Sequence, residues 1–344
     1  MAHADYSIFG DDAPHSRGCG NAALSTTMAS VRMGASGHHK GRGRMIEIKL
    51  FGQTSAVVNG QEVPASSLSA KQRRILEILA LNAGSPVTKE RLADLLWEGS
   101  PPASYVGTLD SYVCVLRRTL GLGAGRSSLL ATTPVGYVLA IGDEVSVDLW
   151  QFQALAAEAA DACGERAVAT TQAALQLVRG ELLADVLYAD WAVRAREVSD
   201  RMLVEVCLKG AQRANALGKS ATAERFARLA VEKDVVCEDA WRQLMLAHWF
   251  SGRRGRALAA YGELRAAMAE QVGDEPSSET YQLYLTILRD ASEADARHLD
   301  DERAELTTLL RLLRQALDCM PGVRAPARDA ALSEVAMRAL AGAA

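Results

Sequence analysis

The order of short elements between residues 46 and 143 constrains the fold of this chain more than any other feature. β-forming residues alternate with polar ones at its start, and Asn59-Gly60 predicts a tight hairpin turn. Three helical stretches follow, and a second hairpin is expected around Thr133-Pro134-Val135-Gly136. A hairpin, three helices and a closing hairpin within about 100 residues are typical of a winged helix-turn-helix, an α+β fold.

Capping signals set the bounds of the three helices. The first is expected from about Ser69 to Leu81, with its apolar residues turned inward. The second starts after Thr88, whose side chain can cap it. The third follows Pro101-Pro102 and ends at about Leu120, because a glycine such as Gly121 is common just past a helix end.

The third helix has two contrasting faces. Its apolar residues are spaced 3, 4, 3 and 4 apart and predict one buried stripe: Val106, Leu109, Val113, Leu116 and Leu120. The opposite stripe is small, polar or basic: Ser104, Thr108, Ser111, Val115 and Arg118. Such a face suits the major groove of DNA, because bulky side chains would keep the helix away from base edges. Tyr112 and Arg117 flank this stripe and are within reach of phosphates.

Further candidate DNA contacts lie outside that stripe. They come from the start of the first helix, the start of the third helix and the second hairpin: Lys71, Arg73, Tyr105, Thr132, Thr133 and Tyr137. The second hairpin is expected to act as a wing against the adjacent minor groove or backbone. Residues 46–144 hold nine basic and nine acidic side chains. A net-neutral domain is expected to bind DNA modestly and to rely on dimers or partners for affinity.

The second half of the chain predicts a different architecture. From Asp148 to Asp290 it is almost purely helical and rich in alanine and leucine. Helix pairs are expected at 148–179, 191–233 and 236–272, with a last helix at 278–290. A spacing of roughly 34 residues resembles tetratricopeptide stacking. The fold class is therefore mainly α, with a winged helix-turn-helix followed by an all-α tetratricopeptide-like helical-repeat domain.

Four segments follow from these patterns. Residues 1–44 are rich in glycine, serine and alanine, lack periodicity, and are expected to be a disordered tail. The winged-helix domain is placed at 45–145 and the helical domain at 146–290. Residues 291–344 are expected to form a helical extension with a cluster of leucines and an alanine-rich flexible end.

The chain lacks the usual motifs of catalysis and cofactor binding. No P-loop, nucleophile elbow or zinc-protease motif occurs, and the glycines from Gly121 to Gly125 follow a helix, where we expect a linker. His248 falls in an apolar helix without partners at metal-ligand spacing, and the six cysteines form no C-x-x-C pair. We therefore expect no enzyme activity, no cofactor and no metal site.

Nothing in the sequence points to a membrane. No apolar run approaches the ~18 residues needed to cross a bilayer. The first residues, from Met1 to Gly20, lack the hydrophobic core of a signal peptide. We expect a cytoplasmic, nucleoid-associated protein.

Several motifs in residues 46–290, about 70% of the chain, resemble the Streptomyces antibiotic regulatory protein family of transcriptional activators. The first domain is similar to OmpR-type winged helices in Leu68-Ser69-Ala70-Lys71-Gln72-Arg73, Leu92-Ala93-Asp94-Leu95-Leu96-Trp97 and Pro134-Val135-Gly136-Tyr137. The second resembles the bacterial transcriptional activation domain in Asp148-Leu149-Trp150-Gln151-Phe152, Ala240-Trp241-Arg242-Gln243-Leu244 and Gly273-Asp274-Glu275-Pro276.

This resemblance implies a mode of action. Members bind direct repeats in promoters of biosynthetic gene clusters as head-to-tail dimers, and they recruit RNA polymerase through its sigma factor and adjoining subunits. Members often carry arginine where this chain has Val115, and a basic residue near Thr133. The DNA face therefore has two fewer cations than expected, and Val115 is suited to pack on a thymine methyl group.

Two hypotheses about function follow. The first is a sequence-specific transcriptional activator of a secondary-metabolite cluster. The second is a helical-repeat regulator that binds a protein or senses a ligand, with weak or no direct DNA binding. The neutral charge of residues 46–144 and the valine at position 115 favour the second hypothesis somewhat.

Overall fold

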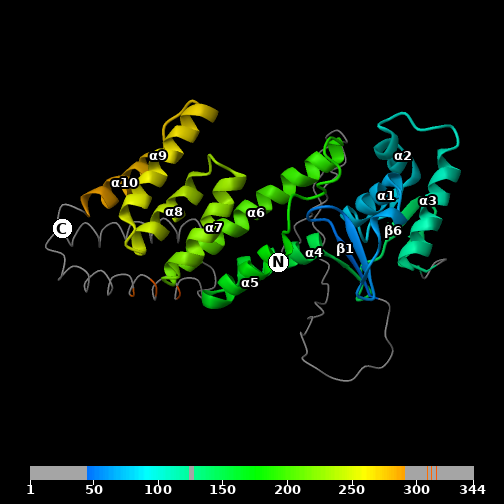
Figure 1. Ribbon diagram of the computed structural model, residues 1–344, viewed down its shortest axis with the longest axis horizontal. Helices are drawn as coiled ribbons and strands as arrows, with labels where there is room; N and C mark the ends of the chain where they lie inside the picture. Colours follow the sequence, from blue (N-terminus) through cyan, green and yellow to red (C-terminus); the bar gives the residue numbers. More distant parts are fainter. Residues whose placement is uncertain (1–44, 124–127, 291–307, 309–310, 312–314, 316–344) are drawn as a thin grey trace, which may run out of the picture. The chain divides into compact units, whose positions relative to one another are not determined.

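The computed structural model describes residues 45–123 and 128–290, together with Thr308, Arg311 and Gln315 (Figure 1). The predictions for residues 1–44 and for the rest of 291–344 lie outside the described residues. The chain divides into two compact units. Of the described ranges, 45–50, 54–123 and 128–147 belong to the first unit, and 51–53 and 148–290 belong to the second.

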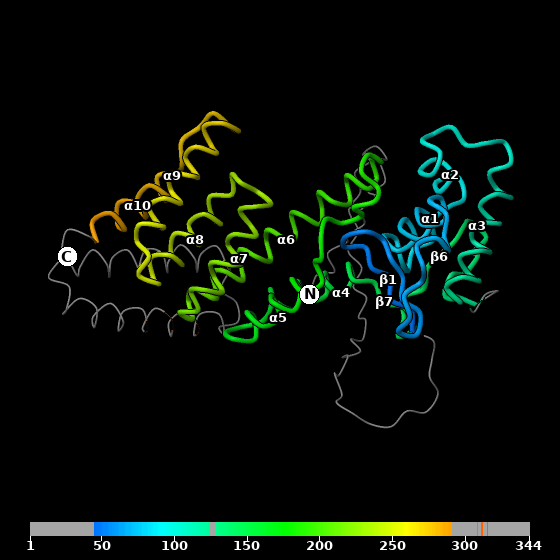
Figure 2. The backbone as a smooth tube through the Cα atoms, in the orientation of Figure 1, coloured from blue at the N-terminus to red at the C-terminus, as the bar shows by residue number. Residues whose placement is uncertain are grey.

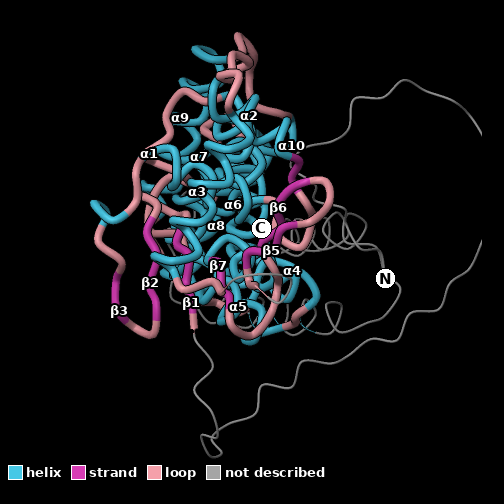
Figure 3. The backbone as a smooth tube through the Cα atoms, turned by 90° about the vertical axis from the view of Figure 1, so that its right-hand side faces the viewer, coloured by secondary structure: helices cyan, strands magenta, loops and turns pink. Residues whose placement is uncertain are grey.

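The first unit opens on a four-stranded sheet in the order β3-β2-β1-β7, which Figure 3 shows side by side. Strand β1 pairs antiparallel with β2 and parallel with β7. The predicted Asn59-Gly60 turn joins β2 to β3, and both residues have positive φ, as a type I′ turn requires. The strands are β1 (Ile46–Lys49), β2 (Ser55–Val58), β3 (Gln61–Glu62) and β7 (Val145–Val147).

Three helices follow this sheet, and a one-turn 3-10 segment at Ala65–Ser67 precedes them. Ser69 and Gln72 form a capping box at the first helix, and Thr88 accepts a hydrogen bond from the Arg91 amide at the second. The third helix ends at Gly121, which has a φ of 63°. The predicted bounds are thus confirmed to within a few residues: α1 (Ala70–Leu81), α2 (Lys89–Trp97) and α3 (Tyr105–Leu120).

The buried stripe of α3 is confirmed at four of its five positions. Leu109, Val113, Leu116 and Leu120 are fully buried, whereas the prediction for Val106 is wrong because its side chain is 41% exposed. Val106 lies in the first turn of α3, ahead of the residues that pack into the core. Periodicity gives the direction of a side chain but not whether another element covers it.

A second sheet of three strands closes the first unit, in the order β4-β6-β5. Here β6 pairs antiparallel with both neighbours. A Cβ built on Gly136 would lie 2.0 Å from the carbonyl oxygen of Val87, so only glycine lets β6 approach β4 this closely. The strands are β4 (Val87–Thr88), β5 (Leu130–Thr132) and β6 (Gly136–Leu139). The predicted second hairpin is thus confirmed and completes a winged helix-turn-helix.

The second unit is a succession of helices, and each packs against its neighbour in the chain (Figure 2). Alanines dominate the contacts between α6, α7, α8 and α9, around the buried rings of Phe226, Trp241 and Trp249. The helix pairs predicted from sequence are present. They are α4 (Asp148–Asp161) with α5 (Gly164–Leu177), α6 (Asp190–Ala216) with α7 (Ser220–Lys233), and α8 (Glu238–Phe250) with α9 (Arg254–Gln271), followed by α10 (Ser278–Arg289).

Three residues from the early part of the chain belong with these helices. Phe51 is buried, forms a bridge with Leu182, and lies edge-on to Phe152 with 5.5 Å between ring centroids. Its amide donates to the carboxylate of Asp148 at 3.2 Å. Phe51–Gln53 therefore groups with the helical unit, although these residues lie within the segment 45–145 that the sequence assigns to the winged helix.

Candidate DNA interface

The predicted DNA-facing stripe of α3 lies on the accessible side of the helix. Ser104, Ser111 and Arg118 are exposed, and Thr108 and Val115 are half-buried. Thr108 donates its hydroxyl to the carbonyl of Ser104 at 3.2 Å, and Ser111 donates to the carbonyl of Gly107 at 2.9 Å. Because both protons are used within the helix, these hydroxyls present acceptor oxygens outward, and Thr108 and Val115 add methyl groups.

Arg117 joins α3 to the wing. Its Nε donates to the carbonyl of Leu130 at 2.8 Å, and its Nη2 donates to Oγ1 of Thr132 at 2.8 Å. The side chain was predicted to reach phosphates, but the structure turns it toward β5. Two hydrogen bonds from one planar guanidinium hold the helix and the strand in a fixed relation.

Asp110 makes a second connection between α3 and its neighbours. Its carboxylate accepts a hydrogen bond from Lys89 Nζ at 2.8 Å and another from the hydroxyl of Tyr137. The Lys89 ammonium also lies 5.5 Å from the centroid of the Tyr137 ring. The hydrogen bonds from Lys89 and Tyr137 lower the pKa of Asp110. Burial and the bond to Asp110 raise the pKa of Tyr137, so its phenol stays protonated.

Tyr137 was predicted as a DNA contact, and its position argues for a different role. The ring is buried, and its hydroxyl is directed at Asp110. No local pattern indicated the Asp110–Lys89–Tyr137 cluster, because its members come from α3, α2 and β6. We assign Tyr137 to positioning the wing.

Lys71 is also directed at the protein. Its ammonium donates to the carbonyl of Leu96 and lies 5.3 Å from the centroid of the Trp97 ring. Burial lowers the pKa of Lys71, with the positive charge of Arg74 acting in the same direction. This lysine ties α1 to the end of α2. Arg73, two residues further along α1, is half-buried.

The remaining predicted residues surround the stripe. Tyr105 and Tyr112 are half-buried on α3, and Thr132 is exposed at the end of β5. Thr133 closes the wing turn, because its hydroxyl accepts from the Gly136 amide at 3.1 Å and its amide donates to the Gly136 carbonyl at 2.8 Å. This turn leaves Val135 exposed at the tip of the wing, a position that the sequence did not single out.

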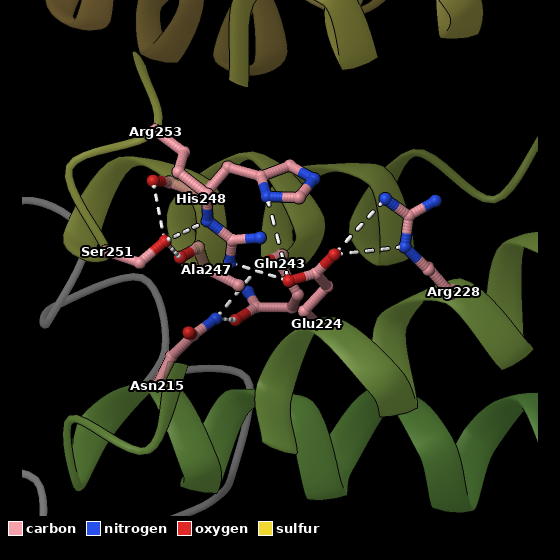
Figure 4. Close-up of polar contacts among 8 residues, drawn as sticks. All are labelled: Asn215, Glu224, Arg228, Gln243, Ala247, His248, Ser251 and Arg253. Carbon is pink, nitrogen blue, oxygen red and sulfur yellow. Dashed lines mark hydrogen bonds and ion pairs between the residues drawn. The ribbon is translucent and has the colours of Figure 1, made fainter. Parts of the chain in front are cut away.

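The second unit contains a cluster of polar side chains around Glu224 (Figure 4). Glu224 on α7 accepts from Arg253 Nη2 at 2.6 Å and from Arg228 at 3.2 Å, and its Oε2 lies 3.9 Å from Nδ1 of buried His248. Burial opposes ionisation of Glu224, but the hydrogen bonds from Arg253 and Arg228 hold its pKa below the usual value. Burial lowers the pKa of His248. The cluster links α7, α8 and the start of α9.

Two negative findings apply to the residues that the structure describes. No group of three or more histidine, cysteine, aspartate or glutamate side chains there is arranged to hold a metal ion. Within the same ranges, no helix combines the length and apolar character required for crossing a bilayer.

Comparison with known proteins matches both units. Residues 61–139 match the family model "Transcriptional regulatory protein, C terminal", and residues 147–288 match the model "Bacterial transcriptional activator domain". The winged helix-turn-helix and the helical unit that follows it in the chain thus define the class of this protein as a transcriptional regulator.

Relatives narrow the class to a family. The regulatory protein DnrI of Streptomyces peucetius is 33% identical over 71% of this chain and 92% of its own length. The transcriptional regulatory protein MoaR1 of Mycobacterium tuberculosis is 31% identical over 71% of this chain and 79% of its own. A solved structure of Mycobacterium tuberculosis EmbR in complex with a low affinity phosphopeptide aligns with a TM-score of 0.61 and 28% identity, covering 78% of this chain and 71% of that one. The chain belongs to the Streptomyces antibiotic regulatory protein family of transcriptional regulators.

Proposed function

We propose that this protein is a sequence-specific activator that inserts α3 into the major groove of promoter DNA. The observation behind this proposal is the accessible stripe of α3, which is held to the wing by the two hydrogen bonds of Arg117. A recognition helix needs a fixed relation to its wing, because both must engage the same stretch of duplex.

The side chains divide into base-facing and backbone-facing groups. Base edges are assigned to the predicted DNA-facing stripe of α3: Ser104, Thr108, Ser111, Val115 and Arg118. Phosphate and sugar contacts are assigned to its surroundings: Arg73, Tyr105, Tyr112, Thr132 and Thr133. Lys71, Arg117 and Tyr137 support this surface from within the protein, since their polar groups bind protein atoms.

Dimeric binding supplies the affinity that the single unit lacks. Residues 46–144 have equal numbers of basic and acidic residues, and two of the basic ones, Lys71 and Arg117, are engaged by carbonyl oxygens. Two copies bound head to tail on direct repeats each gain from the effective concentration created by the other. RNA polymerase, including its sigma factor, is the second partner, and we propose that the helical unit contacts it.

The regulated genes are proposed to be those of a secondary-metabolite cluster, acted on in the cytoplasm at the nucleoid. The support is the likeness to a Streptomyces regulator over 92% of that relative's length. The match of residues 147–288 to an activator domain favours activation over repression. The likeness of the helical unit to tetratricopeptide repeats is likewise a proposal and rests on the spacing of its helix pairs.

A gel-shift titration of the full chain on a promoter fragment from its own gene neighbourhood tests this function. We expect retardation at low salt that weakens steeply as salt rises, because phosphate contacts release counterions. No retardation at low salt, with and without RNA polymerase, would overturn the proposal. That result would favour the alternative, a helical-repeat regulator that binds a protein or a ligand with little direct DNA affinity.

A further inference from the structure

The loop between α5 and α6 is held rigidly by one buried arginine. Arg196 on α6 donates through Nη1 to the carbonyl of Val186 at 2.9 Å and through Nη2 to the carbonyl of Leu187 at 2.6 Å. Its Nε lies 3.3 Å from the Glu181 carboxylate. Arg196 Nη1 also donates to the carbonyl of Leu183 at 3.3 Å, and the buried side chain of Leu183 anchors this part of the loop. The backbone of this loop is therefore fixed before any partner arrives.

This fixed loop displays apolar side chains to solvent. Leu187 is 52% exposed and Tyr188 is 90% exposed, and Val193 in the first turns of α6 is 36% exposed. Single exposed apolar residues are ordinary, but here three lie within seven positions of one fixed segment, and we treat them together as an apolar group. Tyrosine is enriched among residues that dominate binding energy, and a pre-ordered loop loses little entropy on binding.

Acidic side chains flank these apolar residues along the chain. Asp185 in the loop is exposed, and Asp190 and Glu197 are exposed on the first two turns of α6, with the base Arg194 between them. Asp190, Val193 and Glu197 are three, four and seven positions apart, so they share one face of the helix. An apolar centre with an acidic rim is complementary to an apolar surface rimmed by lysine and arginine.

We propose that residues 185–197 are a docking surface for a basic, amphipathic surface of RNA polymerase holoenzyme. The proposal rests on the proposed function and names the part of the helical unit that meets the polymerase. The acidic rim would repel the phosphates of DNA. A second copy meeting this surface symmetrically would set acid against acid. These charges favour a basic protein partner over both other occupants.

An apolar group of this size suits a transient contact. Three apolar side chains cover far less than the ~800 Å² per partner of a stable interface. Both proteins are bound to one promoter, however, and the resulting effective concentration makes a weak contact sufficient. The surface is therefore expected to give weak but measurable binding to holoenzyme in free solution and to matter most for activation on the promoter.

Transcription in vitro from a promoter template tests the surface with full-length protein and RNA polymerase holoenzyme. The double variant Leu187→Ser/Tyr188→Ser is expected to retain its melting temperature and its gel shift, and to lose activation by about tenfold. The matched control is Val272→Ser/Tyr281→Ser, which changes two exposed apolar residues near α9 and α10 and is expected to activate normally. Asp185→Lys/Asp190→Lys is expected to lose activation as well, and the activation that remains should depend less on salt concentration than that of the parent.

The outcomes separate this inference from the proposed function. If Leu187→Ser/Tyr188→Ser shifts DNA and activates as well as the parent, the proposed docking surface is wrong and the proposed activator function is unaffected. If the parent fails to shift DNA, the docking surface is tested by binding of the full chain to immobilised holoenzyme. Equal binding by parent and variant would then show that the proposed docking surface is wrong. A change of sedimentation in the variant from dimer to monomer, without change in holoenzyme binding, would overturn it in favour of self-association.

Discussion

The Arg117 guanidinium on α3 donates through Nη2 to Oγ1 of Thr132 on β5, at 2.8 Å. The Nε of the same side chain donates to the carbonyl of Leu130, also at 2.8 Å. The helix that we assign to the major groove and the strand that leads into the wing are therefore joined by one side chain. These two hydrogen bonds support the candidate interface, and the phosphate contact of Arg117 expected from the sequence stays a prediction.

Replacing Arg117 by glutamine tests whether this side chain holds the wing in place or contacts a DNA phosphate. We expect DNA affinity to fall by about tenfold, because loss of two hydrogen bonds from a charged donor costs ~1–2 kcal/mol and loosens the wing. The slope of affinity against salt should stay unchanged in fluorescence-anisotropy titrations. Thr132→Val removes one of the two hydrogen bonds and serves as the matched control, with a smaller loss. A slope reduced by about one would show that Arg117 contacts a phosphate.

Arg118 is expected to behave in a different way. It is exposed at the end of the α3 stripe, and Arg118→Ala should cost ~1–3 kcal/mol of discrimination if it contacts a base. If it contacts a phosphate instead, affinity falls on all sequences and the salt slope drops by about one. Titrations on a specific and a scrambled site distinguish the two. Parent-like binding at every salt concentration would mean that α3 is oriented differently on DNA.

Phe51 is expected to stabilise the helical unit rather than the winged helix. It is buried and lies 5.5 Å from Phe152 between ring centroids, so Phe51→Ala should cost ~3–5 kcal/mol. Hydrogen exchange followed by mass spectrometry should show faster exchange in α4 and little change in α3. Met45→Ala, at an exposed position, is the control. Loss of protection in α3 but not in α4 would contradict the assignment of Phe51.

His248 is expected to make stability depend on pH. Burial lowers its pKa in the folded protein, so the unfolded chain takes up the proton first as pH falls below the ordinary value of 6.5. Stability should therefore be highest above that value and decline as pH falls toward the folded pKa. The lowered pKa of Glu224 acts in the same direction at more acidic pH, below its ordinary value of 4.5.

Melting temperatures of His248→Gln between about pH 7.5 and 5.5 test this expectation. The variant should show a flatter profile than the parent, because glutamine does not titrate. Cys207→Ala is a suitable control, since burial raises the pKa of this thiol to about 12 and its removal should lower stability equally at each pH. Identical slopes in His248→Gln and the parent would refute the role of His248.

The candidate interface was predictable where it depends on the helical repeat alone. The period of 3.6 residues places Ser104, Ser111 and Arg118 on one side of α3, and the structure finds all three exposed. The sequence places Arg117 beside that stripe and Tyr137 in the wing, and it predicts both as DNA contacts for that reason. Their partners are Thr132 and Asp110, at separations of 15 and 27 residues.

Local sequence was sufficient to predict the helices and the two hairpins of this protein and, through its motifs, its family. Asn59-Gly60 allows a turn with positive φ, and Ser69 and Thr88 cap the helices they precede, because these effects act within a few bonds of the backbone. What covers each side chain depended on long-range packing. Val106 is exposed, Phe51 joins the helical unit, and Arg196 fixes the loop before α6, because burial and hydrogen-bond partners come from segments far apart in the chain.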